Sequence, residues 1–177
     1  MTLKKGQYYY YQEPNRQVDI IDLPYGNSQF SMTIVLPKDQ TTVPDIVRRL
    51  NQKQLTTWLA NGYTAQDLEL QLPRFKMEYN KEFNDIMTQM GMGEAFTKEA
   101  NFSRMLDNPT ERLFISKIAQ KTFLEVNEEG AEAAAVTVVL TKVDSAPLPV
   151  LVNRPFVFLI REKSTNAILF IGQLMEP

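Results

Sequence analysis

The residues best equipped for chemistry in this sequence are carboxylates, because the chain contains neither histidine nor cysteine. The absence of both types excludes thiolate nucleophiles, Ser-His pairs, imidazole metal ligands and disulfide bonds. Glu128, Glu129 and Glu132 lie close together and could serve as a paired acid and base, as in a glycosidase. A short solvated charged stretch explains the same residues more simply. We therefore expect no catalytic residue, no metal site and no cofactor.

The most informative segment is 128–149, because its two halves favour different structures. Residues 131–135 are mostly alanine and favour a helix, whereas residues 136–140 are mostly β-branched and favour a strand. Gly130 precedes both and could act as a hinge. A core helix or strand fits poorly, because the alanines have little to pack and the strand formers do not alternate. The alternative is a segment with two states, an exposed loop and an inserted strand.

Length and composition exclude several classes of protein. A chain of 177 residues that is 44% hydrophobic can form one domain with a substantial core. Because 19 basic residues are outnumbered by 21 acidic ones, we expect no nucleic-acid partner, and the tyrosines at 8–11 are interpreted as part of a strand. No run of about twenty apolar residues occurs, so no membrane span is expected. The residues after Met1 do not predict a secretory signal, because they lead into tyrosines and not into an apolar run.

The N-terminal part predicts a β-meander followed by two short helices. Apolar and polar side chains alternate at 18–20 and 30–36, and turn-forming residues at 24–28 separate the two runs. Pro44 suits the first turn of one helix. A second helix is predicted after Asn51, ending at Asn61-Gly62.

The remaining sequence predicts further strands and one more helix. Alternation from Leu68 to Tyr79 predicts one strand, which Pro73 would restrict to the edge of a sheet. Asn80 is predicted to cap a helix that ends at Gly91. Further strands are expected at 113–126, 156–160 and 168–171, and the last two runs are typical of strands buried on both faces. The predicted fold class is α+β, with mostly antiparallel sheets and a few short helices.

Four segments together resemble the serpins, the family of suicide-substrate protease inhibitors. Residues 128–135 (EEGAEAAA) resemble the hinge of the family's reactive-centre loop, and residues 152–159 (VNRPFVFL) resemble its C-terminal signature. Residues 169–173 (LFIGQ) resemble the closing strand, and residues 72–91 resemble a strand-then-helix segment. The resemblance covers all 177 residues, but only the C-terminal half of a family whose members are about twice as long.

The resemblance implies a single partial serpin domain over residues 1–177, with the reactive-centre loop at about 128–149. It also implies a protein that is not an enzyme, and it favours an extracellular or periplasmic location over a cytoplasmic one. Inhibitory members need small residues in the hinge, and this sequence satisfies that requirement. The implied hinge residues are Glu128, Glu129, Gly130, Ala131, Ala133, Ala134 and Ala135.

The family's spacing places the cleaved bond at Asp144–Ser145. Counting forward from the hinge Gly130 and back from Asn153 of the signature gives the same residue, Asp144. An aspartate at this position implies a protease with a basic primary pocket, such as a caspase-like or granzyme-B-like enzyme. The alternative from the residue alone is that Asp144 is an ordinary loop aspartate near a turn.

Two further alternatives remain open. A shifted register would make Lys142 the recognised residue, which implies a trypsin-like protease instead. A non-inhibitory serpin, acting as a carrier or chaperone, would have bulky or charged hinge residues, and the alanines argue against it. The residues implied to contact the protease before the cleaved bond are Thr141, Lys142 and Val143.

The resemblance also implies a mechanism and a set of partners. In the family, the protease forms an acyl-enzyme with the loop, and the severed loop then inserts into the large sheet as a new strand. Because half of the fold is missing, we expect this chain alone not to inhibit. The expected partners are a target protease, the missing N-terminal half, and other copies of the chain through exposed sheet edges.

Overall fold

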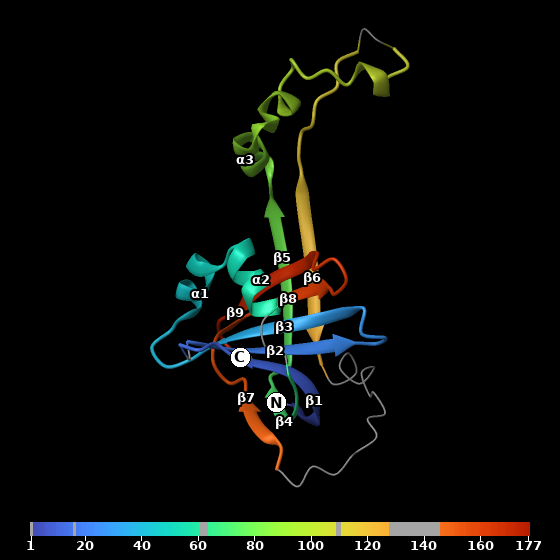
Figure 1. Ribbon diagram of the computed structural model, residues 1–177. Coiled ribbons are helices and arrows are strands. Elements are labelled where there is room, and N and C mark those ends of the chain that lie inside the picture. Colours follow the sequence, from blue (N-terminus) through green and yellow to red (C-terminus); the bar gives the residue numbers. More distant parts are fainter. Residues whose placement is uncertain (1, 16, 61–63, 109–110, 128–145) are drawn as a thin grey trace. The chain divides into compact units, whose positions relative to one another are not determined.

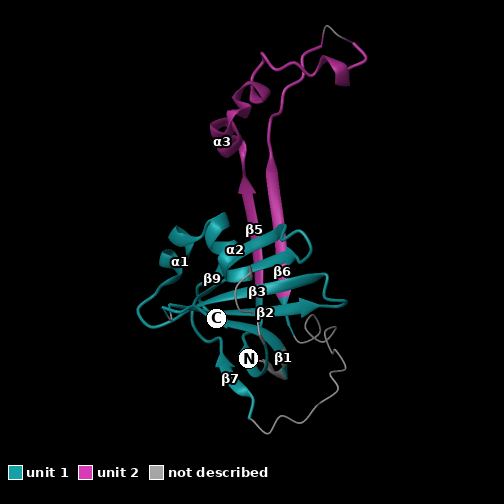
Figure 2. Cartoon of the chain, in the orientation of Figure 1, with its two compact units in different colours: residues 1–75, 126–177 teal, residues 76–125 magenta. Residues whose placement is uncertain are grey.

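The computed structural model describes residues 2–15, 17–60, 64–108, 111–127 and 146–177 (Figure 1). The chain divides into two compact units, one formed by residues 1–75 with 126–177 and one by residues 76–125 (Figure 2). Strands are the main regular element, and the helices are short. The predicted α+β class with mostly antiparallel sheets is confirmed.

The larger unit contains a seven-stranded sheet, in which all neighbouring strands are antiparallel except the first two. In order across the sheet, the strands are β7 (Leu148–Leu151), β4 (Thr64–Leu72), β1 (Thr2–Gln12), β2 (Val18–Tyr25), β3 (Phe30–Pro37), β8 (Phe156–Glu162) and β9 (Ile168–Leu174). Because β1, β2 and β3 are consecutive and adjacent, the predicted meander is confirmed.

The first helix, α1 (Val43–Arg49), begins with a capping box. The Thr42 side chain accepts a hydrogen bond from the backbone N–H of Asp45, and the Asp45 carboxylate accepts one from the backbone N–H of Thr42. Pro44 occupies the first turn, where its missing N–H costs nothing. These local contacts explain why the sequence predicted this helix correctly.

The second helix, α2 (Gln52–Ala60), begins three residues after the end of α1. Asn51 caps its first turn, because the Asn51 side chain accepts a hydrogen bond from the backbone N–H of Gln54 at 2.9 Å. Its predicted end at Asn61-Gly62 lies outside the described residues. Both helices pack on one face of the sheet. The buried residues of this core are Val18, Ile20, Val35, Val43, Ile46, Trp58, Val157 and Leu159.

The other face of β8 carries an aromatic cluster. Phe156 and Phe158 alternate with the two β8 residues that face the helices, so they point to the opposite side. The Phe75 ring lies 6.0 Å from the Phe156 ring and 5.6 Å from the Phe158 ring, between centroids. Phe158 also pairs with Gly172 of β9, where the absent side chain leaves room for the ring.

The smaller unit is built on a two-stranded sheet with short helical turns at one end. The Asn84 side chain ties these parts together, since it donates to the Ser116 carbonyl and accepts from the Ile118 N–H. The elements are β5 (Phe75–Glu82), α3 (Asn84–Met87), a π-helical turn at Thr88–Met92, 3-10 turns at Gly93–Phe96 and Ser103–Met105, and β6 (Ala119–Val126).

The single strand predicted from Leu68 to Tyr79 was wrong, because two strands occur there in different sheets. Pro73 separates them, since it cannot donate a ladder hydrogen bond. The prediction of an edge position was also wrong for β4, which lies between β1 and β7. The sequence of β4 alone cannot show whether β4 is an edge strand, because its neighbour β7 comes from a segment about 80 residues later in the chain.

Two boundaries near the smaller unit also differ from expectation. Asn80 does not cap a helix, because the chain stays extended to Glu82 and the Phe83 N–H donates to the Ile118 carbonyl at 2.9 Å. The predicted strand at 113–126 begins only at Ala119, since the Asn84 side chain occupies the backbone groups just before it. The helical turns are interrupted at Gly91, where φ is 96°, but they do not end there as predicted, because a 3-10 turn follows at Gly93–Phe96.

The expectation that residues 168–171 are buried on both faces was wrong, whereas it was correct for most of residues 156–160. Ile168, Leu169, Phe170 and Ile171 are 39 to 55% exposed. They belong to the edge strand β9, which has β8 as its only neighbour among the described strands. The run is therefore apolar, yet the described residues leave it largely exposed.

Candidate functional site

Residues 128–145 of the predicted reactive-centre loop at 128–149 lie outside the described residues, which resume at Ala146, and its last two residues belong to β7. The hinge, the recognition residues and the proposed cleaved bond all fall within 128–145 and therefore stay predictions. The structure does describe the two strands that flank this segment. β6 ends at Val126 and β7 begins at Leu148, and the two strands belong to different sheets.

The strand that leads into the segment is largely exposed. Among the described strands, β6 pairs only with β5, so its second edge has no strand neighbour there. Phe123 on β6 is 54% exposed, and the Lys76 ammonium lies 4.9 Å from the centre of its ring. Lys117, just before β6, forms an ion pair with Glu82 at 2.9 Å. An exposed strand with one unpaired edge is able to accept an added strand.

The strand that follows the segment is short but anchored. β7 runs parallel to β4, and the N–H of Val152 extends the pairing by donating to the Gln71 carbonyl at 2.9 Å. Val150 is buried, whereas Leu148 and Leu151 are each 42% exposed. The chain that follows the segment is thus held at one edge of the seven-stranded sheet, as strand β7.

Arg154 fixes the path from β7 into β8. Its Nε donates to the carbonyl of Pro37, the last residue of β3, at 2.7 Å. The positive charge of Arg154 also acts on the Tyr10 side chain, whose pKa it lowers. Burial of Tyr10, followed by the negative charge of Asp19, outweighs this effect and raises the Tyr10 pKa to about 12. The Tyr10 hydroxyl accepts a hydrogen bond from the Gln12 amide at 2.7 Å and stays protonated at neutral pH.

A buried polar network supports β8 and the turn after it. Arg161 donates to the Asp22 carboxylate at 3.1 Å and to the Thr33 hydroxyl at 3.0 Å, and Thr33 donates to the same carboxylate at 2.6 Å. The third guanidinium nitrogen, Nη1, donates to the side-chain oxygen of Asn166 at 2.8 Å. Sequence reasoning missed this network, although an Asp and an Arg inside otherwise apolar strands are a usable signal.

The turn between β8 and β9 is organised by the carboxylate of Glu162. It accepts hydrogen bonds from the backbone N–H groups of Ser164 and Thr165 and from the Thr165 hydroxyl, at 2.5 to 2.9 Å. The Thr165 hydroxyl and then these N–H groups lower the pKa of Glu162 from 4.5 to about 2, because they bind the charged form.

We expect the Glu162 carboxylate in this turn to make the stability of the folded protein fall at low pH. The pKa of Glu162 is lower in the folded than in the unfolded chain, so its stabilisation is complete above about pH 4.5 and disappears as the pH falls towards 2. The Glu162→Gln variant should therefore show a smaller loss of stability in this range, measured as the urea midpoint against pH. The Glu176→Gln variant is the control, and an unchanged profile for Glu162→Gln would contradict the assignment.

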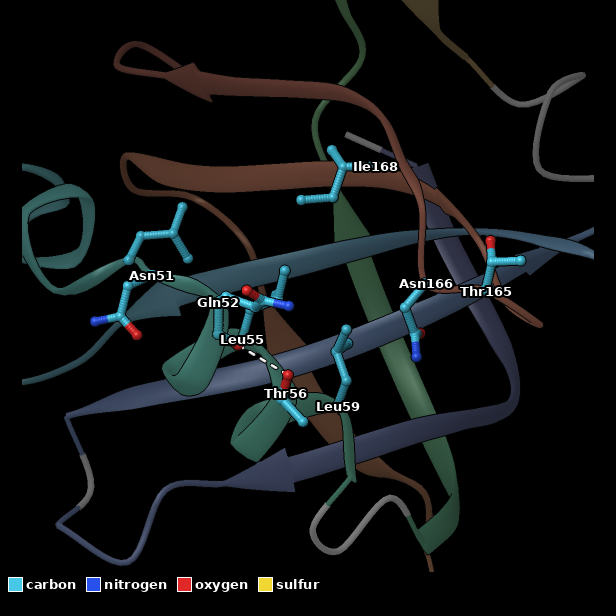
Figure 3. Close-up of a pocket in the computed structure, with 9 residues that line it drawn as sticks. Asn51, Gln52, Leu55, Thr56, Leu59, Thr165, Asn166 and Ile168 are labelled. Carbon is cyan, nitrogen blue, oxygen red and sulfur yellow. Dashed lines mark hydrogen bonds between the residues drawn. The ribbon is translucent and has the colours of Figure 1, made fainter.

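A cavity of about 610 Å³ lies between α2 and the β8–β9 turn (Figure 3). Its lining is uncharged and mixes aliphatic with amide and hydroxyl side chains. Asn166 is held there by the buried Arg161, and Thr56 is hydrogen-bonded to the Gln52 carbonyl at 2.8 Å. The lining residues are Leu50, Asn51, Gln52, Leu55, Thr56, Leu59, Thr165, Asn166 and Ile168. Such a space could hold a small uncharged molecule.

The described part of the chain contains no cluster of three acidic, histidine or cysteine residues that could bind a metal ion. Within the same residues, no helix has the length and apolar composition needed to cross a lipid bilayer.

Comparison with known proteins gives the family. Residues 1–177 match the model of a family described as serpin (serine protease inhibitor). The chain therefore belongs to the serpin family, and the resemblance found in its sequence is confirmed.

Individual relatives agree with this assignment. Human neuroserpin is 35% identical over 185 aligned residues, which include 100% of this chain and 44% of neuroserpin. Among solved structures, thyroxine-binding globulin in complex with thyroxine has a TM-score of 0.80 and 25% identity, covering 99% of this chain and 45% of that one. Mouse protein-Z dependent protease inhibitor has a TM-score of 0.77 and 28% identity, covering 99% and 44%. The chain thus spans less than half the length of these relatives.

Proposed function

We propose that this chain is the C-terminal part of a suicide-substrate inhibitor of endopeptidases. The observation that carries the proposal is the family match over the whole chain, together with the alanine-rich tract that directly follows β6. In this proposal the chain is not an enzyme. It forms one domain together with the portion that its longer relatives possess.

The mechanism depends on where the tract can go after cleavage. The protease attacks the Asp144–Ser145 bond and forms an acyl-enzyme with Asp144. The freed tract then pairs with the edge of β6 that has no neighbour among the described strands, and its small residues Ala131, Ala133, Ala134 and Ala135 meet little steric resistance. Deacylation needs the protease's oxyanion-hole donors and general base in accurate positions, so deforming the protease prevents hydrolysis of the ester.

The residue at the cleaved bond determines the class of protease. A carboxylate at Asp144 would form a bidentate pair with an arginine in the primary pocket, as caspase-like and granzyme-B-like enzymes provide. If Lys142 is recognised instead, the target is trypsin-like, and the cleaved bond lies two residues earlier. Thr141 and Val143 would then occupy different subsites in the two cases.

The experiment compares this chain with a protein completed by the portion present in its relatives. Each is incubated with granzyme B and with trypsin, and detergent-stable complexes are detected by electrophoresis. We expect a granzyme B complex from the completed protein, loss of that complex in Asp144→Ala, and no loss in the matched Lys142→Ala variant. The 177-residue chain alone should be cleaved without forming a complex.

Other results would assign the function differently. A trypsin complex that only Lys142→Ala abolishes would move the recognised residue to Lys142. Cleavage of the completed protein without a covalent complex would contradict inhibition. A stable complex with the 177-residue chain alone would show that the missing portion is not needed.

A carrier function is the second candidate, and the uncharged cavity lined by Leu55, Leu59 and Ile168 is the observation that favours it. Thyroxine-binding globulin, which shares this fold, is in complex with thyroxine, so a protein of this architecture can hold a small molecule. A carrier would be cleaved by proteases without trapping them, and the electrophoresis experiment therefore separates the two candidates.

A further inference from the structure

The smaller unit contains an acceptor sequence for a glycan. Residues 101–103 (NFS) match the tripeptide Asn-X-Ser/Thr in which X is not proline, and N-linked oligosaccharides are attached to proteins at this tripeptide. A second asparagine also precedes a hydroxyl residue by two positions, at residues 108–110 (NPT), but its central proline excludes it. The 177-residue sequence therefore offers one acceptor, Asn101.

The Asn101 side chain uses its oxygen and leaves its nitrogen available. The oxygen, Oδ1, accepts hydrogen bonds from the Ser103 hydroxyl at 2.8 Å and from the Ser103 backbone N–H at 3.3 Å. The nitrogen, Nδ2, donates no hydrogen bond to any other residue that the structure describes, and both residues are exposed. A glycan bonds to Nδ2 and not to Oδ1, so the two hydrogen bonds that lead into the 3-10 turn at Ser103–Met105 are compatible with a glycan.

The exposure of Asn101 does not depend on a missing strand neighbour. Asn101 lies between two turns whose backbone hydrogen bonds are internal. The Ala100 N–H donates to the Thr97 carbonyl at 3.2 Å, and the Met105 N–H donates to the Phe102 carbonyl at 2.9 Å. Within the smaller unit, the second turn lies at the end away from β5 and β6 (Figure 1). The segment therefore presents a polar loop, and not an open strand edge, to its surroundings.

We propose that Asn101 carries an N-linked oligosaccharide when the protein passes through a eukaryotic secretory pathway. In this reaction Nδ2 attacks the anomeric carbon of an oligosaccharide that is joined to a lipid through a pyrophosphate. A bond forms between this carbon and Nδ2, the bond from the carbon to the pyrophosphate oxygen breaks, and the lipid pyrophosphate leaves. Nδ2 gives one proton to the transferring enzyme, and no group is oxidised or reduced. The proposal does not depend on protease inhibition.

Ser103 provides the second part of the acceptor, because the transferring enzyme requires a hydroxyl two residues after the asparagine. In the folded chain this hydroxyl donates to Asn101 and is not packed in a core. Ser103→Thr keeps a hydroxyl at this position, whereas Ser103→Ala removes it. The two variants therefore separate recognition of the tripeptide from any general effect of changing residue 103.

Expression with a secretion signal in a eukaryotic host tests this proposal. The 177-residue chain and the completed protein are each analysed by electrophoresis before and after treatment with a peptide N-glycosidase. Cell extracts and medium are both analysed, so that a chain retained in the cell is still scored. We expect the 177-residue chain to show one decrease in mobility that the glycosidase reverses, and mass spectrometry to locate the glycan at Asn101. Ser103→Thr should keep this shift, and Ser103→Ala should lose it.

Asn101→Asp is the matched variant, because a carboxylate can accept the same two hydrogen bonds but has no nitrogen to carry the glycan. It should lose the shift. The completed protein is compared with its own Asn101→Asp variant, since the added portion can carry glycans of its own. Pro109→Ala is the positive control, because it turns residues 108–110 into an acceptor and should add a second shift.

Three results would overturn the proposal. The first is an unmodified Asn101 in the 177-residue chain, most directly in a host that does modify Pro109→Ala, and it would leave Asn101 only its hydrogen bonds to Ser103. The second is a shift that persists in Asn101→Asp of the 177-residue chain, which would place the glycan on another residue. The third is modification of the 177-residue chain but not of the completed protein, which would mean that the completed fold covers Asn101.

Discussion

Replacing Arg161 by methionine should destabilise the protein by about 3–5 kcal/mol, because it leaves a buried carboxylate without its partner. Arg161 and Asp22 are 5% and 1% exposed, and their ion pair at 3.1 Å is completed by the Thr33 hydroxyl. Water cannot replace the lost guanidinium at this depth. Urea unfolding followed by far-UV circular dichroism measures the change.

An exposed ion pair provides the matched control. Arg48 and Asp45 are joined at 2.7 Å, but their side chains are 76% and 39% exposed, so Arg48→Met should change stability by less than about 1 kcal/mol. Replacing both buried partners, as in Asp22→Val with Arg161→Met, should recover part of the loss. Equal losses from Arg161→Met and Arg48→Met would contradict the role of burial.

The Gly172→Ala substitution should cost about 1–3 kcal/mol through overpacking. A Cβ atom at this position would lie 2.4 Å from Cζ of Phe158 and 2.8 Å from its Cε1. The Phe158 ring cannot move away easily, because Phe75 and Phe156 pack against it. Urea unfolding again provides the measurement.

A second glycine in the same sheet serves as its control. At Gly6 of β1, an added Cβ would meet the nearest atoms, those of the Tyr8 ring, at 3.5 Å, which is an ordinary contact. Gly6→Ala should therefore be neutral or slightly stabilising. Adding Phe158→Leu to Gly172→Ala should cost less than Phe158→Leu costs alone, since the smaller side chain relieves the contact. Additive losses in this cycle would show that the two positions do not clash.

The family could be predicted from the sequence because its signals are local, whereas the site residues themselves stay predictions. The alanines from 131 to 135, the hinge Gly130 and the signature at 152–159 are short motifs, and the family they indicate is confirmed. The Asp22–Arg161 pair was not predicted, because its members are 139 residues apart and meet only through the pairing of β2, β3 and β8.

The sequence by itself determined the family, the meander of β1 to β3, and the presence of the helices α1 and α2. Each of these depends on alternation, turn residues or hydrogen bonds within a few positions. Only the tertiary structure decided that the chain on either side of Pro73 enters two different sheets and that the apolar β9 is an exposed edge. Sheet membership and burial depend on which distant strands lie alongside a segment, and the local sequence pattern of that segment does not specify them.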